Sequence, residues 1–393
     1  MSDPKFIPPR QNPLLIRLVQ SIFYLVTYFA FKFRLTVAEE DLAKVRAIAS
    51  SRVVYLPNHS NLDDGVAVFQ LSARIGQLFH YVVAIEAFQG VVGKILQLVG
   101  AYSLHRGVGD RSSVRQTLNI LQQPRCKLVI FPEGGCSYQN DTVIPFRTGA
   151  IELSLKALEK LVKQENTVPN FYLVPVSLKY CYLSNTKEQI DRALERLETA
   201  LLVKSDRSDA YTRLRAIAKK VLNNLEAEYH VTVEQTDWNQ RLENLRKQML
   251  GYCEAKLDIA AKNQLPNRER VYRVQSVLRN LSASDRTAAI DYEHLYLTTV
   301  RLLNFDAIYD GYVAEKPTPE RFFATIDRLE REVFASDRPR FKGRREIIAK
   351  IGTPINLKDY WQEYQSDRPT ASRIQIINNL TEMVQQEVQT NLS

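Results

Sequence analysis

The sequence contains few histidines and lacks the cysteine pairs that bind structural zinc. It has 5 histidines and 4 cysteines in 393 residues. The cysteines lie far apart, with no C-x-x-C pair and no Cys/His cluster, at positions Cys126, Cys136, Cys181 and Cys253. This spacing argues against a disulfide framework and predicts no metal ligand set, and it is typical of a reducing compartment. We see no internal repeat and no low-complexity tract, so the sequence indicates a folded protein.

Long uncharged runs are also missing. The most apolar stretch, residues 13–35, has 14 uncharged residues between Arg17 and Lys32, whereas a transmembrane helix needs about 20. Its aromatic residues and basic flanks are typical of a helix that lies in the membrane interface. We therefore expect residues 1–45 to form a membrane-associated helical segment, with membrane lipids as partners. A buried core helix is the alternative.

The charge balance favours an anionic partner. The net charge is +9 at pH 7, which suits nucleic acid, an acidic membrane surface or a phosphorylated substrate. An aromatic-basic face and a known nucleic-acid module are both missing, so we expect no nucleic-acid partner.

Residues 52–180 alternate between short β-branched runs and helical segments. Strands are expected at 53–56, 81–85, 101–104, 128–131 and 171–178, and helices at 65–75, 87–98, 110–122 and 148–163. This alternation predicts an α/β core over 46–182, with a mostly parallel sheet flanked by helices. In such sheets, ligands bind at the carboxyl ends of the strands.

The remaining sequence predicts a large helical insertion. Long charged segments with amphipathic spacing fill residues 183–340. A β-branched run at 347–351 then predicts one more strand, followed by a helix at 371–390. Residues 341–393 would therefore complete the α/β domain.

His59 and Asp64 are the first candidate catalytic residues. The stretch "LPNHSNLDDG" (56–65) places His59 in a polar loop after an apolar run. A histidine can accept a proton near neutral pH, and a carboxylate on its other ring nitrogen fixes its tautomer. The alternative is that Asp63 caps the next helix and His59 is a surface residue.

A protein nucleophile to accompany this pair is missing. The sequence has no G-x-S-x-G motif, and we find no cysteine in a plausible nucleophile context. A base and its orienting carboxylate without a nucleophile indicate that the substrate supplies one, as a hydroxyl group.

Three further stretches carry candidate binding residues. In "VIFPEGGCSYQ" (129–139), Glu133 follows an apolar strand, and Gly134 and Gly135 allow backbone N–H groups to approach a ligand. Arg106 and Arg147 each lie at an element boundary, where a guanidinium can hold a phosphate.

Together these stretches resemble the four ordered blocks of the glycerolipid acyltransferases. "NHSNLDD" matches the family's N-H-x-x-x-x-D block, which implies His59 as the base and Asp64 as its partner. "GAYSLHRG" resembles the second block, which implies that Arg106 binds the acceptor phosphate. "FPEGG" matches the third block through Glu133, and "VPVSL" resembles the fourth, with Pro175 shaping the wall of the site.

The sequence also departs from the family pattern. After F-P-E-G the family usually has Thr, Arg and Ser, whereas this chain has Gly135, Cys136 and Ser137. The loss of that arginine removes one phosphate contact, for which the segment His105-Arg106-Gly107 and Arg147 are the candidate replacements. The identity of the acceptor is therefore left open.

The resemblance implies direct acyl transfer without a metal, a cofactor or a covalent intermediate. The donor would be a thioester, acyl-CoA or acyl carrier protein, and the acceptor a lysophospholipid such as 1-acyl-glycerol-3-phosphate or another hydroxyl compound. We expect a membrane-associated protein with its catalytic domain on the cytoplasmic side. The alternatives are a hydrolase with metal ligands His59, Asp63, Asp64 and Glu133, and a membrane-surface scaffold without catalysis.

Overall fold

The computed structural model of the protein describes residues 6–183, 185–204, 209–232, 237–281, 291–336, 338–365 and 369–393. The chain forms two compact units. The α/β unit comprises Met1–His105, Asp110–Cys181 and Arg345–Ser393. The helical unit comprises Arg106–Gly109 and Tyr182–Arg344.

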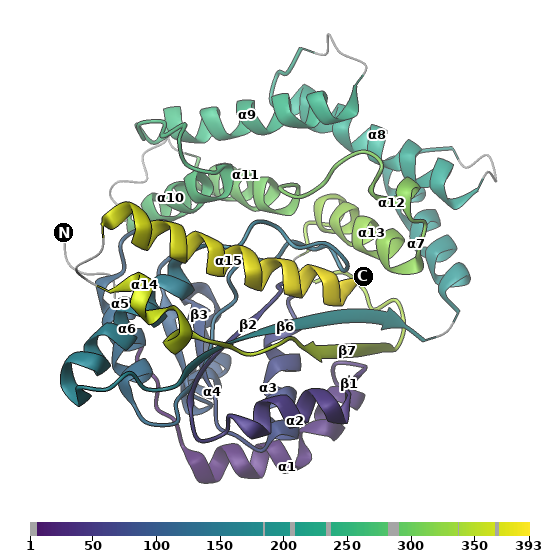
Figure 1. The fold of residues 1–393 in the computed structure, drawn as a ribbon. Coiled ribbons are helices and arrows are strands. Elements are labelled where there is room, and N and C mark those ends of the chain that lie inside the picture. Colours follow the sequence, from purple (N-terminus) through teal and green to yellow (C-terminus); the bar gives the residue numbers. More distant parts are fainter. Residues whose placement is uncertain are drawn as a thin grey trace. The chain divides into compact units, whose positions relative to one another are not determined.

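An eight-stranded sheet organises the α/β unit (Figure 1). Its strands are β1 (Phe33–Val37), β2 (Arg52–Pro57), β3 (His80–Ala84), β4 (Ala101–Leu104), β5 (Lys127–Val129), β6 (Phe171–Tyr182), β7 (Arg345–Ile351) and β8 (Ile355–Asn356). Their order is β1-β7-β6-β2-β5-β3-β4, with β8 antiparallel to β6. The pairs β1–β7, β2–β5, β2–β6, β3–β4 and β3–β5 are parallel. The predicted mostly parallel sheet is confirmed.

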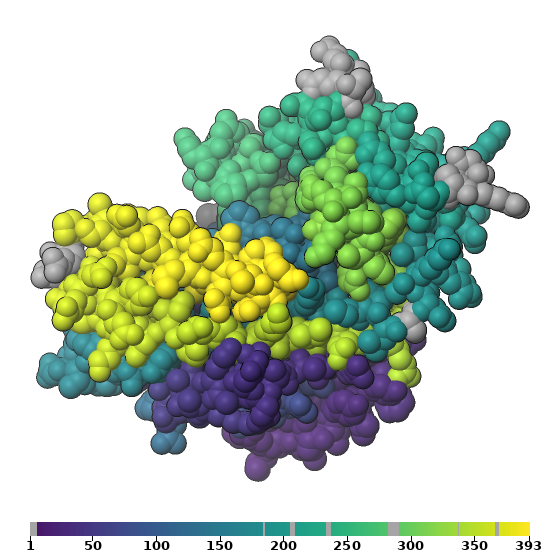
Figure 2. Space-filling view, turned by 45° about the vertical axis from the view of Figure 1, so that its right-hand side comes forward, coloured from purple at the N-terminus to yellow at the C-terminus, as the bar shows by residue number. Residues whose placement is uncertain are grey.

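Helices cover both faces of this sheet, which explains the apolar runs in its strands. The helices of the unit are α1 (Pro13–Phe29), α2 (Glu39–Ala47), α3 (Asp64–Ile75), α4 (Gly90–Leu98), α5 (Arg111–Gln122), α6 (Gly149–Glu165), α14 (Trp361–Tyr364) and α15 (Thr370–Leu392). On β2, Val53 and Tyr55 join the core beneath α1–α3, whereas Val54 and Leu56 join the core beneath α5, α6 and α15. A strand buried on both faces is apolar at every position. In Figure 2 the C-terminal segment, coloured yellow, forms part of the outer surface of this unit.

The N-terminal segment differs from its prediction as a helix over 13–35. Helix α1 ends at Phe29, and Phe33–Val37 form the edge strand β1. Lys32 has a φ of 53°, which breaks the helix. The strand alternates buried Phe33, Leu35 and Val37 with exposed residues, a period of two that the helical interpretation overlooked.

Helix α1 packs one face against the α/β unit. Ile16 is buried, Phe23 contacts the ring of Phe69 edge to face at 4.6 Å, and the Gln20 side chain donates to Ser72 Oγ at 2.9 Å. Among the described residues, no helix is both long and apolar enough to span a bilayer.

The helical unit contains a repeat that the sequence analysis missed. Its helices are α7 (Thr186–Leu201), α8 (Ala210–Glu228), α9 (Trp238–Lys256), α10 (Asn267–Asn280), α11 (Tyr292–Asn304), α12 (Tyr312–Glu315) and α13 (Pro319–Val333). A buried glutamate near the end of one helix pairs with an arginine near the start of the next, in Glu198–Arg213, Glu226–Arg241 and Glu254–Arg270. The glutamates lie 28 residues apart, at 198, 226 and 254. We call each of these pairs a Glu–Arg clamp.

The helix ends repeat as well. Each clamp glutamate accepts, at its carbonyl, the N–H of the residue five positions later, Val203, Val231 or Ile259. The residue between, at positions 202, 230 and 258, has a φ near 50–55° each time. This is the Schellman ending of a helix. The expectation of no internal repeat was therefore wrong, because the repeat is carried by a few spaced positions within otherwise ordinary charged helices.

Candidate active site

His59 and Asp64 lie together at the carboxyl end of β2. The chain leaves β2 at Pro57, and α3 begins at Asp64. The His59 Nδ1 atom lies 3.0 Å from Asp64 Oδ2. The His59 side chain is 22% exposed, whereas that of Asp64 is fully buried. The tight turn therefore presents the imidazole to the outside and holds its orienting carboxylate inside, as the sequence predicts.

Three groups hold the Asp64 carboxylate. Besides the His59 ring, Oδ2 accepts the Asn61 N–H at 2.8 Å, and Oδ1 accepts the Tyr180 hydroxyl at 2.6 Å. Burial, and next the charge of Asp64, raise the pKa of Tyr180 well above its ordinary value, so the hydroxyl keeps its proton and donates. A carboxylate bound on three sides has a fixed position, which in turn fixes the imidazole.

Tyr180 is a site residue that the sequence analysis missed. The predicted strand ended at 178, whereas β6 continues to Tyr182. Val174, Val176, Leu178 and Tyr180 share one face of the sheet. Extending the period-two pattern by one step would have placed Tyr180 on the face that carries Asp64.

Asp63 does not cap α3, contrary to the alternative interpretation of this stretch. Its side chain makes no capping hydrogen bond. Asp63 Oδ2 instead accepts from Arg345 Nη2 at 2.8 Å. The Arg345 guanidinium carbon also lies 5.3 Å from the centre of the Tyr180 ring. The start of β7, far along the chain, thus steadies the turn that carries His59.

The loop after β5 is fastened to the backbone of His59. Glu133 Oε1 accepts the His59 N–H at 2.5 Å, and the Ser137 N–H donates to the His59 carbonyl at 2.7 Å. Glu133 Oε2 accepts the Ile144 N–H at 3.2 Å, and Glu133 is 1% exposed. Both carboxylate oxygens of Glu133 therefore hold backbone N–H groups in place. Substrate binding by Glu133 stays a prediction.

We expect Glu133→Gln to lower the free energy of unfolding by about 1–3 kcal/mol, the cost of leaving a buried donor unsatisfied. The amide offers one accepting oxygen in place of two, so the His59 or the Ile144 N–H loses its partner. Urea unfolding followed by circular dichroism measures this change. Glu165→Gln is the control, since Glu165 is 41% exposed and pairs with Arg52. Equal midpoints for Glu133→Gln and the wild type would contradict this role.

The same loop brings Cys136 to the imidazole. Cys136 Sγ lies 3.4 Å from His59 Nε2 and 3.5 Å from Nδ1. The ring of Phe131 lies against the imidazole, with ring centres 4.5 Å apart. The sequence analysis did not foresee this contact between a cysteine and the imidazole. Cys136 and His59 are 77 residues apart in sequence, and no local pattern connects them.

The electrostatics of this cluster favour a charged imidazole. Burial lowers the pKa of His59, but the electrostatic interaction with Cys136 and the hydrogen bond to Asp64 raise it, and the net pKa lies well above 6.5.

Gly134 and Arg147 form the next part of the loop. Gly134 has a φ of 70°, a conformation that residues with a side chain rarely adopt, and a Cβ atom there would lie 2.4 Å from Arg147 Cζ. The Gly134 N–H donates to the Phe131 carbonyl at 3.1 Å. That amide is therefore already used within the turn. Ligand binding by Gly135 stays a prediction.

Arg106 and Pro175 have other surroundings. Arg106 belongs to the helical unit, where its Nη1 donates to the Tyr272 hydroxyl at 3.1 Å and its Cζ lies 4.3 Å from the Tyr272 ring centre. Pro175 is buried within β6 opposite Leu56, and its carbonyl accepts the Gly352 N–H at 2.9 Å. A phosphate-binding role for Arg106 and a wall-forming role for Pro175 stay predictions.

Within the part of the chain that the structure describes, no three His, Cys, Asp or Glu side chains are grouped so that they could hold a metal ion.

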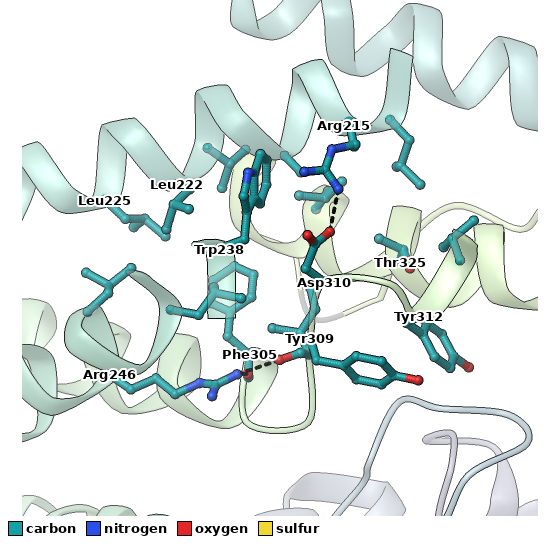
Figure 3. A pocket seen from close by; sticks show the side chains of 18 of the residues that line it. Arg215, Leu222, Leu225, Trp238, Arg246, Phe305, Tyr309, Asp310, Tyr312 and Thr325 are labelled. Atoms are coloured by element: carbon teal, nitrogen blue, oxygen red, sulfur yellow. Dashed lines mark hydrogen bonds and ion pairs between the residues drawn. The ribbon is translucent and has the colours of Figure 1, made fainter. Parts of the chain in front are cut away.

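The helical unit contains an apolar cavity of about 100 Å³ (Figure 3). Its lining comes mainly from α8, α9, α11 and α13 and from residues 308–313. Arg215 pairs with Asp310 at its edge and stacks on Trp238, with Cζ 4.5 Å from the ring centre. The lining includes no histidine and no cysteine, so the cavity has no group suited to acyl-transfer chemistry.

Comparisons with known proteins agree with the chemistry of the His59 cluster. A family model described as Acyltransferase matches residues 34–179. A protein from Aedes aegypti named regulator of telomere elongation helicase 1 homolog is 28% identical over 138 residues, which are 35% of this chain and 13% of that protein. The helicase name describes that much longer protein. Residues 34–179 of this chain are thus similar to the Acyltransferase family, which includes the glycerolipid acyltransferases.

Proposed function

We propose that the protein is an O-acyltransferase that moves a fatty acyl group from a thioester donor, acyl-CoA or acyl carrier protein, to a hydroxyl group of a glycerolipid precursor such as 1-acyl-glycerol-3-phosphate. The observation that carries the proposal is the His59–Asp64 pair, in a turn at the carboxyl end of a parallel strand within the matched residues. The family match supports acyl transfer to a lipid-type acceptor as the class of reaction.

In this proposal His59 acts as a general base. Asp64 holds Nδ1, so Nε2 faces outward to take a proton from the attacking group. Positioned proton transfer of this kind contributes about 10²–10⁴-fold to a rate. The thiolate of the donor is a good leaving group, so the carbonyl needs no further activation by the chain.

The acceptor is proposed to carry a phosphate, which Arg147 would bind. The Arg147 side chain lies against Gly134, in the loop that is hydrogen-bonded to His59. The backbone N–H of Arg147 donates to the Pro132 carbonyl at 2.9 Å, which fixes the position of this residue in the loop. A guanidinium can bind two phosphate oxygens at once.

The test is to incubate the purified protein with radiolabelled palmitoyl-coenzyme A and a panel of acceptors, and to separate the lipid products by chromatography. The panel contains 1-acyl-glycerol-3-phosphate, glycerol 3-phosphate and lysophosphatidylcholine. The proposal predicts a labelled ester with at least one phosphorylated acceptor. Labelled free fatty acid as the only product, with every acceptor, would show a hydrolase instead.

We also propose that α1 rests on a membrane surface. The helix presents a stripe of exposed apolar side chains, at Leu14, Leu18, Ile22, Leu25 and Phe29, each 51–85% exposed. Helix α4 of the same unit adds exposed Val91, Val92 and Ile95. The N-terminus of α1 lies beside the end of α4, since Asn12 N–H donates to the Leu98 carbonyl. Exposed Arg10, Arg17 and Lys94 flank these apolar residues, as expected beside anionic headgroups.

We expect the double substitution Leu18→Asp/Leu25→Asp to reduce binding to vesicles of phosphatidylcholine and phosphatidylglycerol at least tenfold. Burial of each leucine contributes about 1.5–3 kcal/mol, and 1.4 kcal/mol is a factor of ten. Vesicle co-sedimentation measures the binding. Deleting residues 1–36 would be a poorer experiment, because it removes most of strand β1.

The control for this experiment is Leu202→Asp, because Leu202 lies in the helical unit and is 91% exposed. It should bind vesicles as the wild type does. Unchanged binding by the double variant would show that α1 is not the attachment surface.

A further inference from the structure

Arg345 is the residue at which the chain returns from the helical unit to the α/β unit. It begins β7, the strand that lies between β1 and β6 in the sheet. Its backbone is held on both sides. The Arg345 N–H donates to the Lys32 carbonyl at 3.0 Å, and the preceding carbonyl, that of Arg344, accepts the Leu183 N–H at 3.1 Å. The point from which the Arg345 side chain extends is therefore fixed.

The Arg345 guanidinium is buried among groups of the α/β unit. Only 6% of the residue is exposed. Its Nη2 atom donates to the Asp63 carboxylate at 2.8 Å and to the Phe31 carbonyl at 3.2 Å. Its Cζ atom lies 5.3 Å from the centre of the Tyr180 ring. Because the guanidinium is planar and its donors have fixed directions, partners on its edge and its face hold it in one position.

Asp63 joins this cation to the turn that carries His59. Its side chain is 14% exposed, and that of Arg345 is 7% exposed. The Asp63 N–H donates to the Asn61 side chain at 3.1 Å, and the Asn61 N–H donates to Asp64 Oδ2 at 2.8 Å. Asp63 and Asp64 are consecutive, and their carboxylates bind Arg345 and His59 respectively. A shift of Asp63 would therefore move the carboxylate that orients the imidazole.

We propose that Arg345 is a positioning residue for His59 and acts on it through Asp63. The inference rests on the proposed acyl transfer, in which Nε2 of His59 faces the acceptor hydroxyl. Arg345 binds Asp63 and not the imidazole, so its contribution is to geometry. A displacement of about 1 Å at a reacting group can lower a rate by about 10²-fold, even when its cause lies outside the reacting groups.

The first measurement is the kinetics of Arg345→Met, which removes the guanidinium but keeps an apolar stem. We expect kcat for ester formation from palmitoyl-coenzyme A to fall by about 10²-fold. The KM values for donor and acceptor should stay within threefold of the wild type, because the proposed binding residues remain. Arg345→Lys should lose less than tenfold in kcat, since it keeps the charge but not the planar fork.

Glu346→Gln is the matched control. Glu346 is the next residue of β7 and pairs with Arg34 of β1 at 3.2 Å. Its side chain faces the opposite side of the sheet from that of Arg345, because side chains alternate along a strand. We expect its kcat to stay within threefold of the wild type. An equal loss in Glu346→Gln and Arg345→Met would show that any damage to this edge lowers activity, and it would overturn the positioning role.

A double variant separates positioning from stability. Asp63→Asn/Arg345→Met removes both charges of the buried pair, and uncharged residues can often replace such a pair without loss of stability. We expect the midpoint of urea unfolding to return toward that of the wild type, while kcat stays low. Recovery of kcat together with the midpoint would show a merely structural role. If Arg345→Met does not fold, the double variant provides the kinetic test.

Nuclear magnetic resonance measures the His59–Asp64 contact without turnover. In protein labelled with ¹⁵N-histidine, the proton on His59 Nδ1 gives a downfield signal when it is hydrogen-bonded to Asp64. His59→Ala identifies this signal among those of the 5 histidines. We expect the signal in the wild type and in Glu346→Gln. It should shift or disappear in Arg345→Met and in the double variant.

The two measurements keep this inference apart from the proposed function. A wild type that forms no ester would overturn the acyltransferase, and the histidine signal would still show whether Arg345 holds the pair. Ester formation by the wild type together with an unchanged signal in Arg345→Met, or a kcat of that variant within threefold of the wild type, would overturn the positioning role alone. A loss confined to KM would assign Arg345 to substrate binding and overturn it as well.

Discussion

His59→Ala should lower the turnover of acyl transfer by about 10³-fold, within the range that a positioned base contributes. The imidazole is the group proposed to take the proton of the acceptor, and Asp64, which orients it, is buried. The measurement is the initial rate of ester formation from palmitoyl-coenzyme A at saturating acceptor.

The fold should survive this substitution, because the His59 ring is partly exposed and its backbone makes the bonds to Glu133 and Ser137. His80→Ala is the control. It removes a partly buried histidine of the same unit whose Nδ1 lies 3.2 Å from the Gly100 carbonyl. A turnover in His59→Ala equal to that of the wild type would contradict the proposed mechanism.

Asp64→Asn should be nearly as damaging, with a loss of about 10³–10⁴-fold in kcat, as expected when an orienting carboxylate becomes an amide. The carboxylate accepts from His59, Asn61 and Tyr180. An asparagine has one accepting oxygen and one NH₂ group. When the NH₂ group faces His59, Nδ1 becomes the acceptor and the proton of the imidazole lies on Nε2, which takes the free lone pair away from the reacting side.

The pH profile distinguishes this role from a merely structural one. The bond to Asp64 is one of the causes that raise the pKa of His59 above 6.5. A base works when neutral, so the wild type should lose kcat/KM for the acceptor as pH falls through that raised pKa. In Asp64→Asn the pKa of His59 falls, and the residual activity should persist to lower pH.

Tyr180→Phe is the matched variant for this second prediction. It removes the hydroxyl that donates to Asp64 Oδ1 but keeps the ring and the carboxylate. We expect a loss of roughly tenfold, the effect of about 1–1.5 kcal/mol from one hydrogen bond. If kcat/KM falls at the same low pH in Asp64→Asn as in the wild type, the carboxylate does not act through His59.

Much of the α/β unit could be predicted because its signals are local. Each expected strand from 53 to 178 occurs within a few residues of its range, as does the strand at 347–351. The strands are apolar on both faces, so a continuous run marks them regardless of face. The prediction failed at β1, where an aromatic-rich helix runs into a five-residue strand, and at β8, which is two residues long.

The contact between His59 and Asp64 could also be predicted, because these residues are five positions apart in one turn. Cys136 and Arg345 could not. Each reaches the turn through the sheet order, Cys136 from the loop after β5 and Arg345 from the start of β7. The sequence alone does not show which residues of neighbouring strands lie side by side. The contacts of Cys136 and Arg345 depend on that pairing.

The Glu–Arg clamps were missed for a different reason. Their members are charged residues in long amphipathic helices, and charged residues there usually lie on solvated faces. Only burial distinguishes them, with the side chains of Glu198, Glu226 and Glu254 at most 6% exposed. Breaking a buried ion pair by removing one partner costs about 3–5 kcal/mol, so these positions should tolerate substitution poorly.

The pairing of β1 with β7 has a consequence for the synthesis of the chain. Phe33 lies opposite Arg345, so the ribosome must add roughly 310 residues before β1 can meet its partner strand. At about 5–20 residues per second this takes about 15–60 s. In the second half of that interval the helical unit, which begins mainly at Tyr182 and whose contacts are closer in sequence, can already be folding, since local contacts form first. The nascent N-terminus, with α1 and an unpaired edge strand, is then the part of the chain most in need of a chaperone or an early lipid surface.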